Sequence, residues 1–345
     1  MPDMRFAPPP AMRVADRGGG LNQTSVRTYN ERLVMSLLRQ FDQLSRMELG
    51  QKSGLSAQTV SVIVRALEQD GLILGGQAQR GRVGPPKIPM ALNPDGAFAI
   101  GVRIGRAGVD LALIDFVGRV RALREHHCEA PSPGQALECL ARDIPKLVSE
   151  IAPALRARLS GVGVAVPRDL ESWPPSQAGD NWAQVNLERR ISAIADLPVH
   201  IQNDVTAAAG AEIAFGMART LGDFAYFYVG ERIESRLVLN HRVYAGEGGA
   251  GPLPGETAPP DHAAELAAAI RALFGFVKVD SIIIDGRLPS GSCEALCTEV
   301  AALLAGLQPV SILAGQVGSV AEVVGAAALC FQSRFMVDDV GLASA

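Results

Sequence analysis

The sequence predicts an α/β protein in which an N-terminal winged helix-turn-helix precedes a larger, two-lobed domain. Three observations support this fold class. Residues 28–92 show short helix patterns followed by a basic segment. From residue 97 to residue 345 strand patterns alternate with helix patterns, and a plan of hairpin strands followed by helices and strands occurs twice. Such alternation is typical of mixed sheets that are covered by helices.

The first residues of the chain are expected to form no part of this fold. Residues 1–27 contain Pro8–Pro10 and Gly18–Gly20 and lack periodicity, which predicts a flexible arm. No apolar run reaches the roughly 18 residues of a membrane span, and no signal-peptide core begins the chain. Five scattered cysteines indicate packed, reduced thiols. We therefore expect a cytoplasmic protein that does not contact a membrane.

The charge of the chain is unevenly distributed. The net charge is −4. Residues 30–90 carry eight Lys or Arg and five Asp or Glu, so this segment is at +3 and the remainder at −7. This asymmetry is expected where one domain meets phosphate and the other does not. The negative net charge itself argues against a protein that coats nucleic acid along its whole length.

Residues 45–70 follow the pattern of a helix-turn-helix. Ser45 and Glu48 form a capping box at the start of a short helix. Gly54 suits the turn, and Ser56 is a natural N-cap for a second helix. The core-facing positions of this second helix are Val60, Ile63, Val64 and Leu67. Its opposite face carries Gln58, Val62, Arg65 and Gln69, with Ala57 and Ser61 beside them.

That opposite face suits the major groove of DNA. Short or amide side chains at the start of a helix let it approach base edges, and Arg65 can then meet phosphate or base. We expect the two helices to contact DNA through Ser45, Arg46, Ser56, Ala57, Gln58, Thr59, Ser61 and Arg65. The alternative interpretation is a three-helix bundle with an ordinary polar surface.

The segment that follows has the character of a wing. Residues 72–74 and 88–92 can pair as two strands. Between them Arg80, Arg82 and Lys87 stand among glycines and prolines. A thin cationic loop of this kind can follow the minor groove, whose narrowing strengthens the attraction for arginine. A basic interdomain linker is the alternative, but the position directly after a helix-turn-helix favours DNA contact.

The larger domain is expected to repeat one plan twice. The first copy predicts strands at residues 98–104, 109–115, 119–126, 161–166 and 199–202, and helices at 134–159, 187–195 and 205–215. The second copy predicts strands at 224–229, 235–240, 242–244 and 281–284, and helices at 261–274, 293–305 and 320–331. Pro145 should kink the first helix. This is the plan of the actin-like, or ribonuclease H-like, kinases, with a cleft between two lobes.

The order of motifs along the chain resembles the ROK family (repressor, open reading frame, kinase) from about residue 21 onward. The residues that carry this resemblance are Tyr29–Leu33, Leu44–Leu49, Gly54–Ser61, Leu67–Leu72, Arg80–Pro86, Leu92–Pro94, Ile114–Gly118, Gly161–Pro167, Asn203–Asp204 and Gly325–Ala327. The resemblance implies transcriptional control of carbohydrate use, with a sugar-type effector. Such regulators bind pseudo-palindromic operators in double-stranded DNA, so a homodimer or homotetramer is expected.

Two departures from the family pattern remove the nucleotide clamp of the kinases. The Asp-x-Gly-x-Thr phosphate loop corresponds to Arg103–Ala107, with arginine for the aspartate and alanine for the threonine. The second phosphate loop corresponds to Gly230–Ser235, where Glu231 and Glu234 would repel phosphate. We therefore expect a domain without catalytic residues and without a bound cofactor.

The family's sugar and zinc elements are also altered. Its Gly-Glu-x-Gly-His element corresponds to Gly251–Gly255, with proline for the glutamate and glycine for the histidine. Its cysteine-rich zinc motif is absent. Cys293 and Cys297 stand four residues apart on an expected helix without partner ligands, so we interpret them as core residues and expect no metal site.

A few residues that could bind a sugar remain in the sequence. Asp204 matches the kinases' general base, and Asn203 beside it would hydrogen-bond sugar hydroxyls. The alternative is that Asp204 only caps the helix that follows it. Asn181 and Trp182, together with Trp173, offer a polar edge and apolar faces for a sugar ring, with packing of the tryptophans as the alternative.

The leading hypothesis is a DNA-binding repressor with an inactive sugar-kinase-like effector domain. Two alternatives stay open. One is an active sugar kinase with an appended DNA-binding domain, and the other is a repressor that responds to no ligand.

Overall fold

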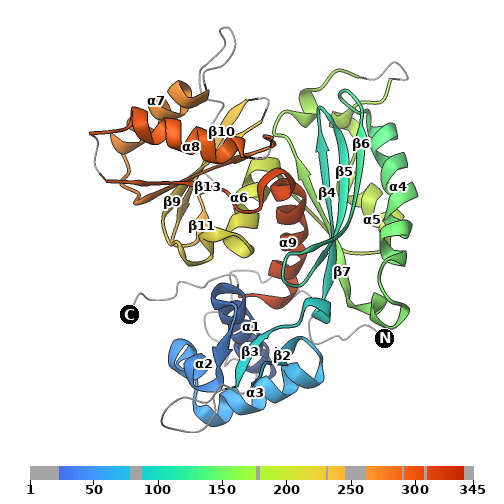
Figure 1. Ribbon diagram of the computed structural model, residues 1–345. Coiled ribbons are helices and arrows are strands. Elements are labelled where there is room, and N and C mark those ends of the chain that lie inside the picture. Colours follow the sequence, from blue (N-terminus) through green and yellow to red (C-terminus); the bar gives the residue numbers. More distant parts are fainter. Residues whose placement is uncertain are drawn as a thin grey trace, which may run out of the picture.

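The computed structural model describes residues 23–77, 88–175, 179–230, 232–244, 262–289, 291–306 and 309–337 (Figure 1). These residues form a small N-terminal domain beneath two α/β lobes, as Figure 1 shows. Within them, no helix combines the length and the apolarity that crossing a membrane requires.

The N-terminal domain is a winged helix-turn-helix. Its described elements are α1 (Gln23–Phe41), β1 (Leu44–Ser45), α2 (Arg46–Ser53), α3 (Ala57–Gln69), β2 (Ile73–Gly75) and β3 (Pro89–Leu92). The strands pair antiparallel in the order β1-β3-β2, so the two expected wing strands do pair. Helix α1 begins at Gln23, and residues 23–27 are therefore helical rather than part of the expected arm.

Local side-chain chemistry sets the boundaries of the two central helices. Ser45 and Glu48 form the capping box at the start of α2. Gly54 ends this helix at φ 71°, a left-handed conformation that glycine adopts without strain. Ser56 caps α3 by accepting a hydrogen bond from the backbone amide of Thr59. All three features match the expectation from the sequence.

The first lobe is a five-stranded mixed sheet in the order β6-β5-β4-β7-β8. Its strands are β4 (Phe98–Gly105), β5 (Gly108–Asp115), β6 (Val120–His127), β7 (Leu159–Val166) and β8 (Val199–Asn203). The first three strands are antiparallel, and β7 and β8 add in parallel. Helices α4 (Pro133–Ser149) and α5 (Leu187–Ala195) cover one face, and α9 (Ala321–Phe335) covers the other.

The second lobe repeats the same topology. Its strands, in the order β11-β10-β9-β12-β13, are β9 (Phe224–Val229), β10 (Ile233–Leu239), β11 (Arg242–Val243), β12 (Ser281–Gly286) and β13 (Ser311–Ala314). Helices α7 (His262–Phe274) and α8 (Ser292–Leu303) pack on one face, and α6 (Asp204–Ala214) packs on the other. In both sheets an antiparallel three-stranded unit is extended by two parallel strands, which confirms the predicted duplication.

One long element differs from the expectation. The helix predicted over residues 134–159 ends at Ser149, and a 3-10 turn, η3 (Pro153–Arg158), leads into β7. Pro153 explains the break, because a proline disfavours helical backbone at the residue before it. Pro145 stays within α4. The short strands β1 and β13 were not expected from the sequence.

Further 3-10 turns join the elements. They are η2 (Pro94–Gly96), η4 (Leu170–Ser172), η5 (Trp182–Gln184), η6 (Met217–Thr220) and η7 (Gly318–Val320).

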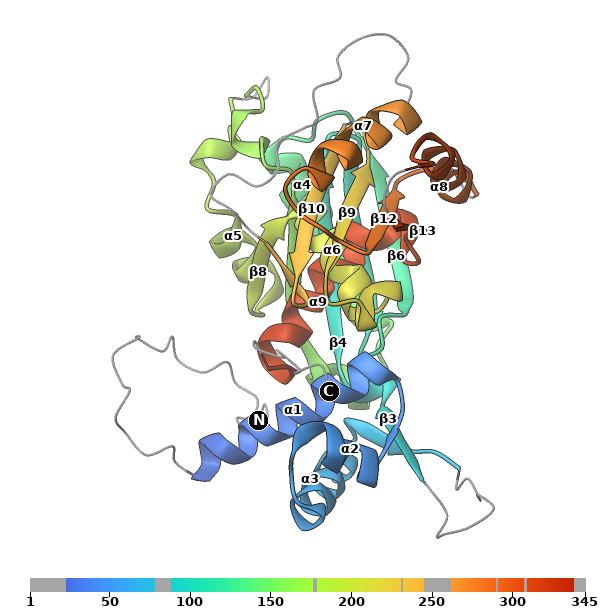
Figure 2. The same ribbon diagram turned by 90° about the vertical axis from the view of Figure 1, so that its left-hand side faces the viewer.

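The N-terminal domain and the lobes share one hydrophobic core. Buried residues of α1 such as Leu37 belong to the same cluster as Phe331 and Phe335 of α9. Figure 2 shows α1 directly beneath the lower end of α9. The helix-turn-helix is therefore joined to the lobes by packing as well as by the chain.

Candidate DNA-binding surface and interlobe cleft

Helix α3 separates a buried stripe from an exposed face, as the sequence predicts. Its buried residues are Val60, Ile63, Val64 and Leu67. Gln58 and Arg65 are exposed, and Val62 beside them is 56% exposed. The helix therefore presents an amide, a guanidinium and a methyl-bearing side chain on one accessible face, and these are the groups that read base edges and phosphates.

The hydroxyl groups expected at this surface also hold the helix together. The Ser56 hydroxyl lies 2.9 Å from that of Thr59, and both are near the start of α3. The Ser61 hydroxyl donates a hydrogen bond to the carbonyl oxygen of Ala57 at 2.8 Å. Each oxygen keeps lone pairs for a further partner. A contact to DNA would therefore add to these local hydrogen bonds.

The remaining residues expected on the first helix lie in different environments. Ser45 is buried, and its hydroxyl and backbone amide both contact the carboxylate of Glu48. Arg46 forms an exposed ion pair with Glu68 of α3, with 3.2 Å between Nη2 and Oε2. Ser45 therefore positions α2 rather than offering its side chain to a partner. Arg46 would have to share its charge between Glu68 and a phosphate.

The structure describes the two strands of the wing but not the cationic loop between them. Strand β2 pairs with β3 from Ile73 opposite Leu92 to Gly75 opposite Met90. Arg80, Arg82 and Lys87 lie outside the described residues.

The two lobes border a cleft of about 490 Å³ whose lining includes many charged side chains. The first lobe contributes Arg103, Gly105, Arg106, Ala107, Pro167, Arg168 and Asp169 to its lining. The second lobe and the helices between the lobes contribute Asp204, Val205, Tyr228, Gly230, Arg232, Glu234, Arg287 and Glu322. Residues from both segments that we expect to correspond to the kinases' phosphate loops therefore border this cavity.

Arg103, which we expect at the position of the phosphate-loop aspartate, is held in a buried ion-pair network. Nε of Arg103 lies 2.6 Å from Oε2 of Glu322, and its Nη1 lies 3.3 Å from Oδ2 of Asp110. Nη1 of Arg287 lies 2.7 Å from the same oxygen of Asp110. Burial lowers the pKa of Arg103, but Glu322 and Asp110 outweigh this effect, and the net result is a raised pKa. The guanidinium stays charged, and its partners in this cluster are the two carboxylates.

Asn203, rather than Asp204, caps helix α6. The Oδ1 atom of Asn203 accepts a hydrogen bond from the amide of Thr206 at 3.1 Å, and Asp204 is the first helical residue. The alternative interpretation of Asp204 as a helix cap is therefore wrong. The Nδ2 group of Asn203 also donates a hydrogen bond to Asp204, and its Oδ1 accepts one from Arg236. Both ends of the amide therefore already have hydrogen-bond partners.

The carboxyl group of Asp204 has an unusually high pKa. Burial, together with the nearby negative charges of Glu322 and Glu234, raises its pKa to about 7. Its Oδ1 accepts a hydrogen bond from the amide of Val205. Near neutral pH this group is present in both forms, so it can either donate to or accept from a ligand hydroxyl.

The tryptophans considered as sugar platforms are packed in the first lobe. Trp182 is 4% exposed and donates from Nε1 to the carbonyl oxygen of Pro131. Asn181 accepts from the amide of Ala183, and neither it nor Trp182 is among the residues that line the cleft. Trp173 is also buried, and its ring lies under the guanidinium of Arg106 at 4.9 Å. Both rings thus belong to the hydrophobic core of the first lobe, and Trp173 packs against Arg106, a residue that lines the cleft.

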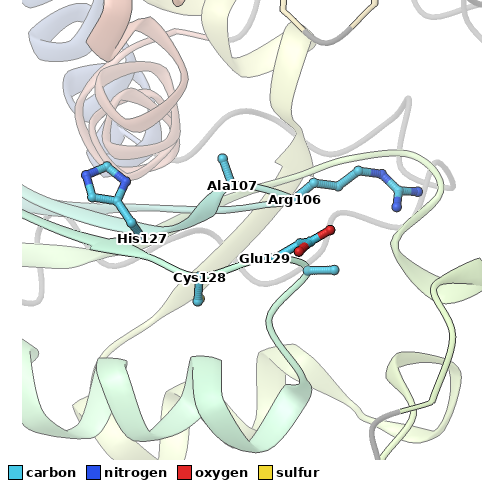
Figure 3. Close-up of a pocket in the computed structure, with 6 residues that line it drawn as sticks. Arg106, Ala107, His127, Cys128 and Glu129 are labelled. Carbon is cyan, nitrogen blue, oxygen red and sulfur yellow. The ribbon is translucent and has the colours of Figure 1, made fainter.

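A second hollow of about 550 Å³ lies at the tip of the first lobe, between the turn after β4 and the residues after β6. It is lined by Arg106, Ala107, His127, Cys128, Glu129 and Ala130. Figure 3 shows His127, Cys128 and Arg106 pointing in different directions rather than toward a common point. A ligand site needs converging polar groups. The cleft between the lobes has them, and this hollow does not.

Cysteines and metal ligands give no further site in the described part of the chain. Cys297 is buried in the core of the second lobe, and Cys293 is half-buried on the same helix. No group of three His, Cys, Asp or Glu side chains suited to a metal ion occurs among the described residues.

Sequence reasoning missed three charged residues that organise the molecule. Asp110 and Glu322 are buried partners of Arg103, and Arg158 contacts the N-terminal domain. A charged residue inside an apolar strand or helix is itself a signal, because a buried charge requires a partner. The sequence alone does not give the identity of that partner.

Comparison with known families agrees with both parts of the fold. Residues 99–264 match the ROK family, and residues 27–73 match a winged helix-turn-helix DNA-binding family. A xylose repressor from Bacillus spizizenii is 26% identical over 233 residues, which cover 66% of this chain and 60% of that protein. The DNA-binding transcriptional dual regulator NagC from Escherichia coli K12 is 27% identical over 236 residues, 66% of this chain and 57% of that protein. The match thus spans about 60% of the length of these curated relatives.

Solved structures share the same fold. A ROK family transcriptional regulator described as a homolog of the E. coli MLC protein aligns with a TM-score of 0.59 at 18% identity, covering 90% of this chain and 97% of that one. A ROK family glucokinase from Streptomyces griseus, solved with glucose and AMPPNP, aligns with a TM-score of 0.53 at 16% identity, covering 68% of this chain and all of that one. The regulator's alignment extends further along this chain than the kinase's, as expected for a chain with an additional N-terminal domain.

Proposed function

Because this chain carries a ROK family domain behind a winged helix-turn-helix, we propose that it is a sequence-specific DNA-binding repressor of carbohydrate-use genes. Its cleft binds a sugar-type effector and does not phosphorylate it. The observation that supports the proposal most directly is the exposed face of α3, the second helix of the helix-turn-helix, which carries Gln58 and Arg65.

The names of the curated relatives support a role in repression. The matched proteins include xylose repressors and an N-acetylglucosamine repressor. These names describe regulators of genes for sugar use, and the chain has both of the domains that such a role requires. We propose that it acts as a homodimer or homotetramer on a pseudo-palindromic operator, since two recognition helices related by symmetry read two half-sites.

The chemistry of the cleft argues against phosphoryl transfer. A kinase needs backbone amides and a metal ion at the phosphates of the nucleotide. At the corresponding position this chain has Arg103, whose charge is taken up by Glu322 and Asp110. Glu234 is one of four carboxylates among the described residues that border the cavity, with Asp169, Asp204 and Glu322. Three of the arginines in the lining, Arg103, Arg106 and Arg287, are each paired with a carboxylate. A lining with charges of both signs suits a small polyol better than a polyanionic nucleotide.

A sugar kinase with an appended DNA-binding domain is the second candidate, and one observation favours it. Asp204 borders the cleft with a pKa raised to about 7, a value that suits a general base near neutral pH. The discriminating measurement is ATP consumption with a panel of sugars. Phosphorylation that is lost in Asp204→Asn would establish the kinase, whereas the repressor proposal expects none from either protein.

Selection of bound fragments from genomic DNA tests the repressor proposal directly. We expect the full chain to enrich a symmetric motif. In Gln58→Ala the preferred base should change at one position of each half-site, by about 1–3 kcal/mol of discrimination. Gln69→Ala is the matched control: Gln69 is an exposed amide on the same face, but it is the last residue of α3 and lies away from the helix start that is expected to read bases. If no fragment is enriched, the proposed function is wrong. If the motif selected by Gln58→Ala is unchanged, the assignment of α3 as the recognition helix is wrong.

The effector part of the proposal requires its own measurement. A sugar that binds the folded chain and is present at about 100 times its dissociation constant should stabilise it by about 2.7 kcal/mol. A thermal shift with one member of a sugar panel, reduced in Asp204→Asn, supports an effector. DNA binding without any such shift would favour a repressor that responds to no ligand.

A further inference from the structure

Two central helices begin at the cleft and end at the DNA-binding domain. Asp204 is the first residue of α6, and Glu322 is the second residue of α9, and both border the cleft. The 15 residues of α9 give it a length of roughly 22 Å at about 1.5 Å per residue. In both views the lower end of α9 lies next to α1 (Figures 1 and 2).

At the cleft, the first turn of α9 takes part in a bridge between the lobes. Glu322 lies within 2.6 Å of Arg103 in the first lobe and within 3.6 Å of Arg287 in the second. Arg287 also contacts Asp110 of the first lobe at 2.7 Å. Asp110 and Glu322 are both more than nine-tenths buried. The relative position of the lobes is therefore set by charges that are costly to separate.

Between their ends, α6 and α9 approach so closely that a methyl group cannot fit. A Cβ atom on Gly325 of α9 would lie 1.7 Å from the carbonyl oxygen of Ala207 in α6. On its other side α9 is seated on the first sheet, where a Cβ on Gly163 would lie 1.7 Å from the carbonyl oxygen of Ala326. Helix α6 is linked to the second sheet, because Arg236 of β10 donates to Thr206 at 2.8 Å. A rotation between the lobes must therefore move α6 along α9.

At the far ends, the α1 segment contacts α9 and the turn that follows α6. Nη1 of Arg39 donates to Oε1 of Gln332 in α9 at 2.9 Å, and the Ser36 hydroxyl accepts from the amide of Val337. Asp42, at the end of α1, pairs with Arg219 in η6, the turn that follows α6. The α1 segment is thus attached to α9 through Gln332 and Val337, and to the turn that follows α6 through Arg219.

We infer that the α6/α9 pair transmits the position of the lobes to α1, so that breaking the interlobe bridge at Arg287 changes DNA affinity from a distance. The inference rests on the proposed function and assigns the regulation of that same cleft. A change in the lobe angle shifts Arg219 relative to Gln332, and α1 follows because it is attached to both. The recognition helix then moves with α1, since the two share one core.

Four dissociation constants for the selected DNA test the coupling: those of the wild type, Arg287→Gln, Asp42→Asn and the double variant. We expect Arg287→Gln to weaken binding by about fivefold or more, within the usual range of allosteric coupling. In the Asp42→Asn background the same change should have less effect, because one anchor of α1 is lost. Asn suits position 42, where φ is +60°. Arg124→Gln is the matched control, as Arg124 forms an exposed pair with Glu150 on the outer face of the first lobe.

The outcomes separate this inference from the proposed function. Absence of DNA binding by the wild type overturns the proposed function. Wild-type binding with an unchanged affinity in folded Arg287→Gln, or equal effects in the two backgrounds, overturns the coupling. Thermal unfolding reports whether each variant folds. If Arg287→Gln does not fold, Arg287→Lys keeps the charge but loses the shared contact with Asp110 and Glu322, and the same cycle is measured with it.

Discussion

At the scale of single residues, the cleft contains charges that depend on one another. Arg103 is 9% exposed, and both of its carboxylate partners are more deeply buried. Methionine would fill much of the space of the Arg103 side chain without its charge. Among the described residues, Glu322 and Asp110 would then keep Arg287 as their cationic partner. We expect Arg103→Met to lower the free energy of unfolding by about 3–5 kcal/mol, as measured by urea denaturation.

Two controls make this prediction specific. Adding Glu322→Gln to the Arg103→Met variant should recover part of the lost stability, because it removes one of the carboxylates that has lost its partner Arg103. Arg124→Met breaks a surface ion pair and should cost less than about 1 kcal/mol. Equal losses for Arg103→Met and Arg124→Met would contradict the assignment of a buried network.

The carboxyl of Asp204 predicts a dependence of stability on pH. Its pKa in the folded protein is about 7, against about 3.9 in an unfolded chain. Between these values the folded state binds the proton and the unfolded state does not, so stability falls as the pH rises from about 4 to about 7. Asp204→Asn should remove a slope of at most about 1.4 kcal/mol per pH unit.

Unfolding by urea at pH 5, 6 and 7 measures this slope. The comparison must be between Asp204→Asn and the wild type, since Asp285 has a similarly raised pKa and the pKa values of His200 and His241 are lowered by burial. Asp143, whose pKa lies well below its usual range, affects stability at a lower pH than the three values of this measurement. Parallel curves for the two proteins would show that Asp204 titrates normally.

At the scale of elements, one arginine fixes the end of the recognition helix. Arg158 in η3 donates to the carbonyl oxygens of Gly71 and Asp95 at 3.0 Å and to that of Asp70 at 3.3 Å. Asp70 is the C-cap of α3, and a cation there satisfies the last carbonyls and opposes the helix dipole. The first lobe thus holds the recognition helix directly.

Removing this contact should loosen the helix without touching the DNA surface. We expect Arg158→Met to speed amide hydrogen exchange in the last turn of α3 and to weaken DNA binding, with a loss of about 1–3 kcal/mol in stability. Arg156→Met is the matched control, because Arg156 lies in the same turn and donates only within the first lobe, to Ile151. Identical exchange in the two variants would show that Arg158 is dispensable.

Elements with local signals could be predicted from the sequence, and elements without them could not. The capping box at Ser45 and the cap at Ser56 mark helix starts through residues three positions away, so these boundaries were correct. Strands β1 and β13 have two and four residues and form because a partner strand is present. The partners of Arg103 lie at positions 110 and 322, and no periodicity connects them. The site could therefore be located by its motifs, but its charge network could not be foreseen.

At the scale of the whole molecule, the N-terminal domain and the lobes are joined by extensive packing. The sequence patterns predict one domain over residues 28–92 and another from residue 97 onward, and they give no information on contacts between the two. In the structure, α1 and α9 share a core, and Arg158, Arg39 and Arg219 each make a contact between the N-terminal domain and the lobes. An arrangement with this many contacts allows movements of the lobes to reach the DNA-binding surface. Such contacts join residues far apart in the chain and are therefore invisible to local patterns.

The distribution of charge over the whole chain supports a final prediction, which concerns the wing. Residues 30–90 are at +3 while the rest of the chain is at −7, so the wing arginines must offset repulsion between DNA and the acidic lobes. Each phosphate that a cation neutralises adds about −0.9 to the slope of log affinity against log salt. Arg80→Ala with Arg82→Ala should therefore weaken binding to all sequences and make this slope shallower by up to about 2.

The preferred core of the operator should stay the same in this variant, because base edges are read by α3 and the wing reads phosphates and groove width. Discrimination should be lost mainly at A·T-rich flanks, where a narrow minor groove attracts arginine most strongly. The measurement is selection from a random pool together with affinities at two salt concentrations. Full affinity in the double variant would mean that the segment only links the domains, and a changed core motif would mean that the wing reads bases.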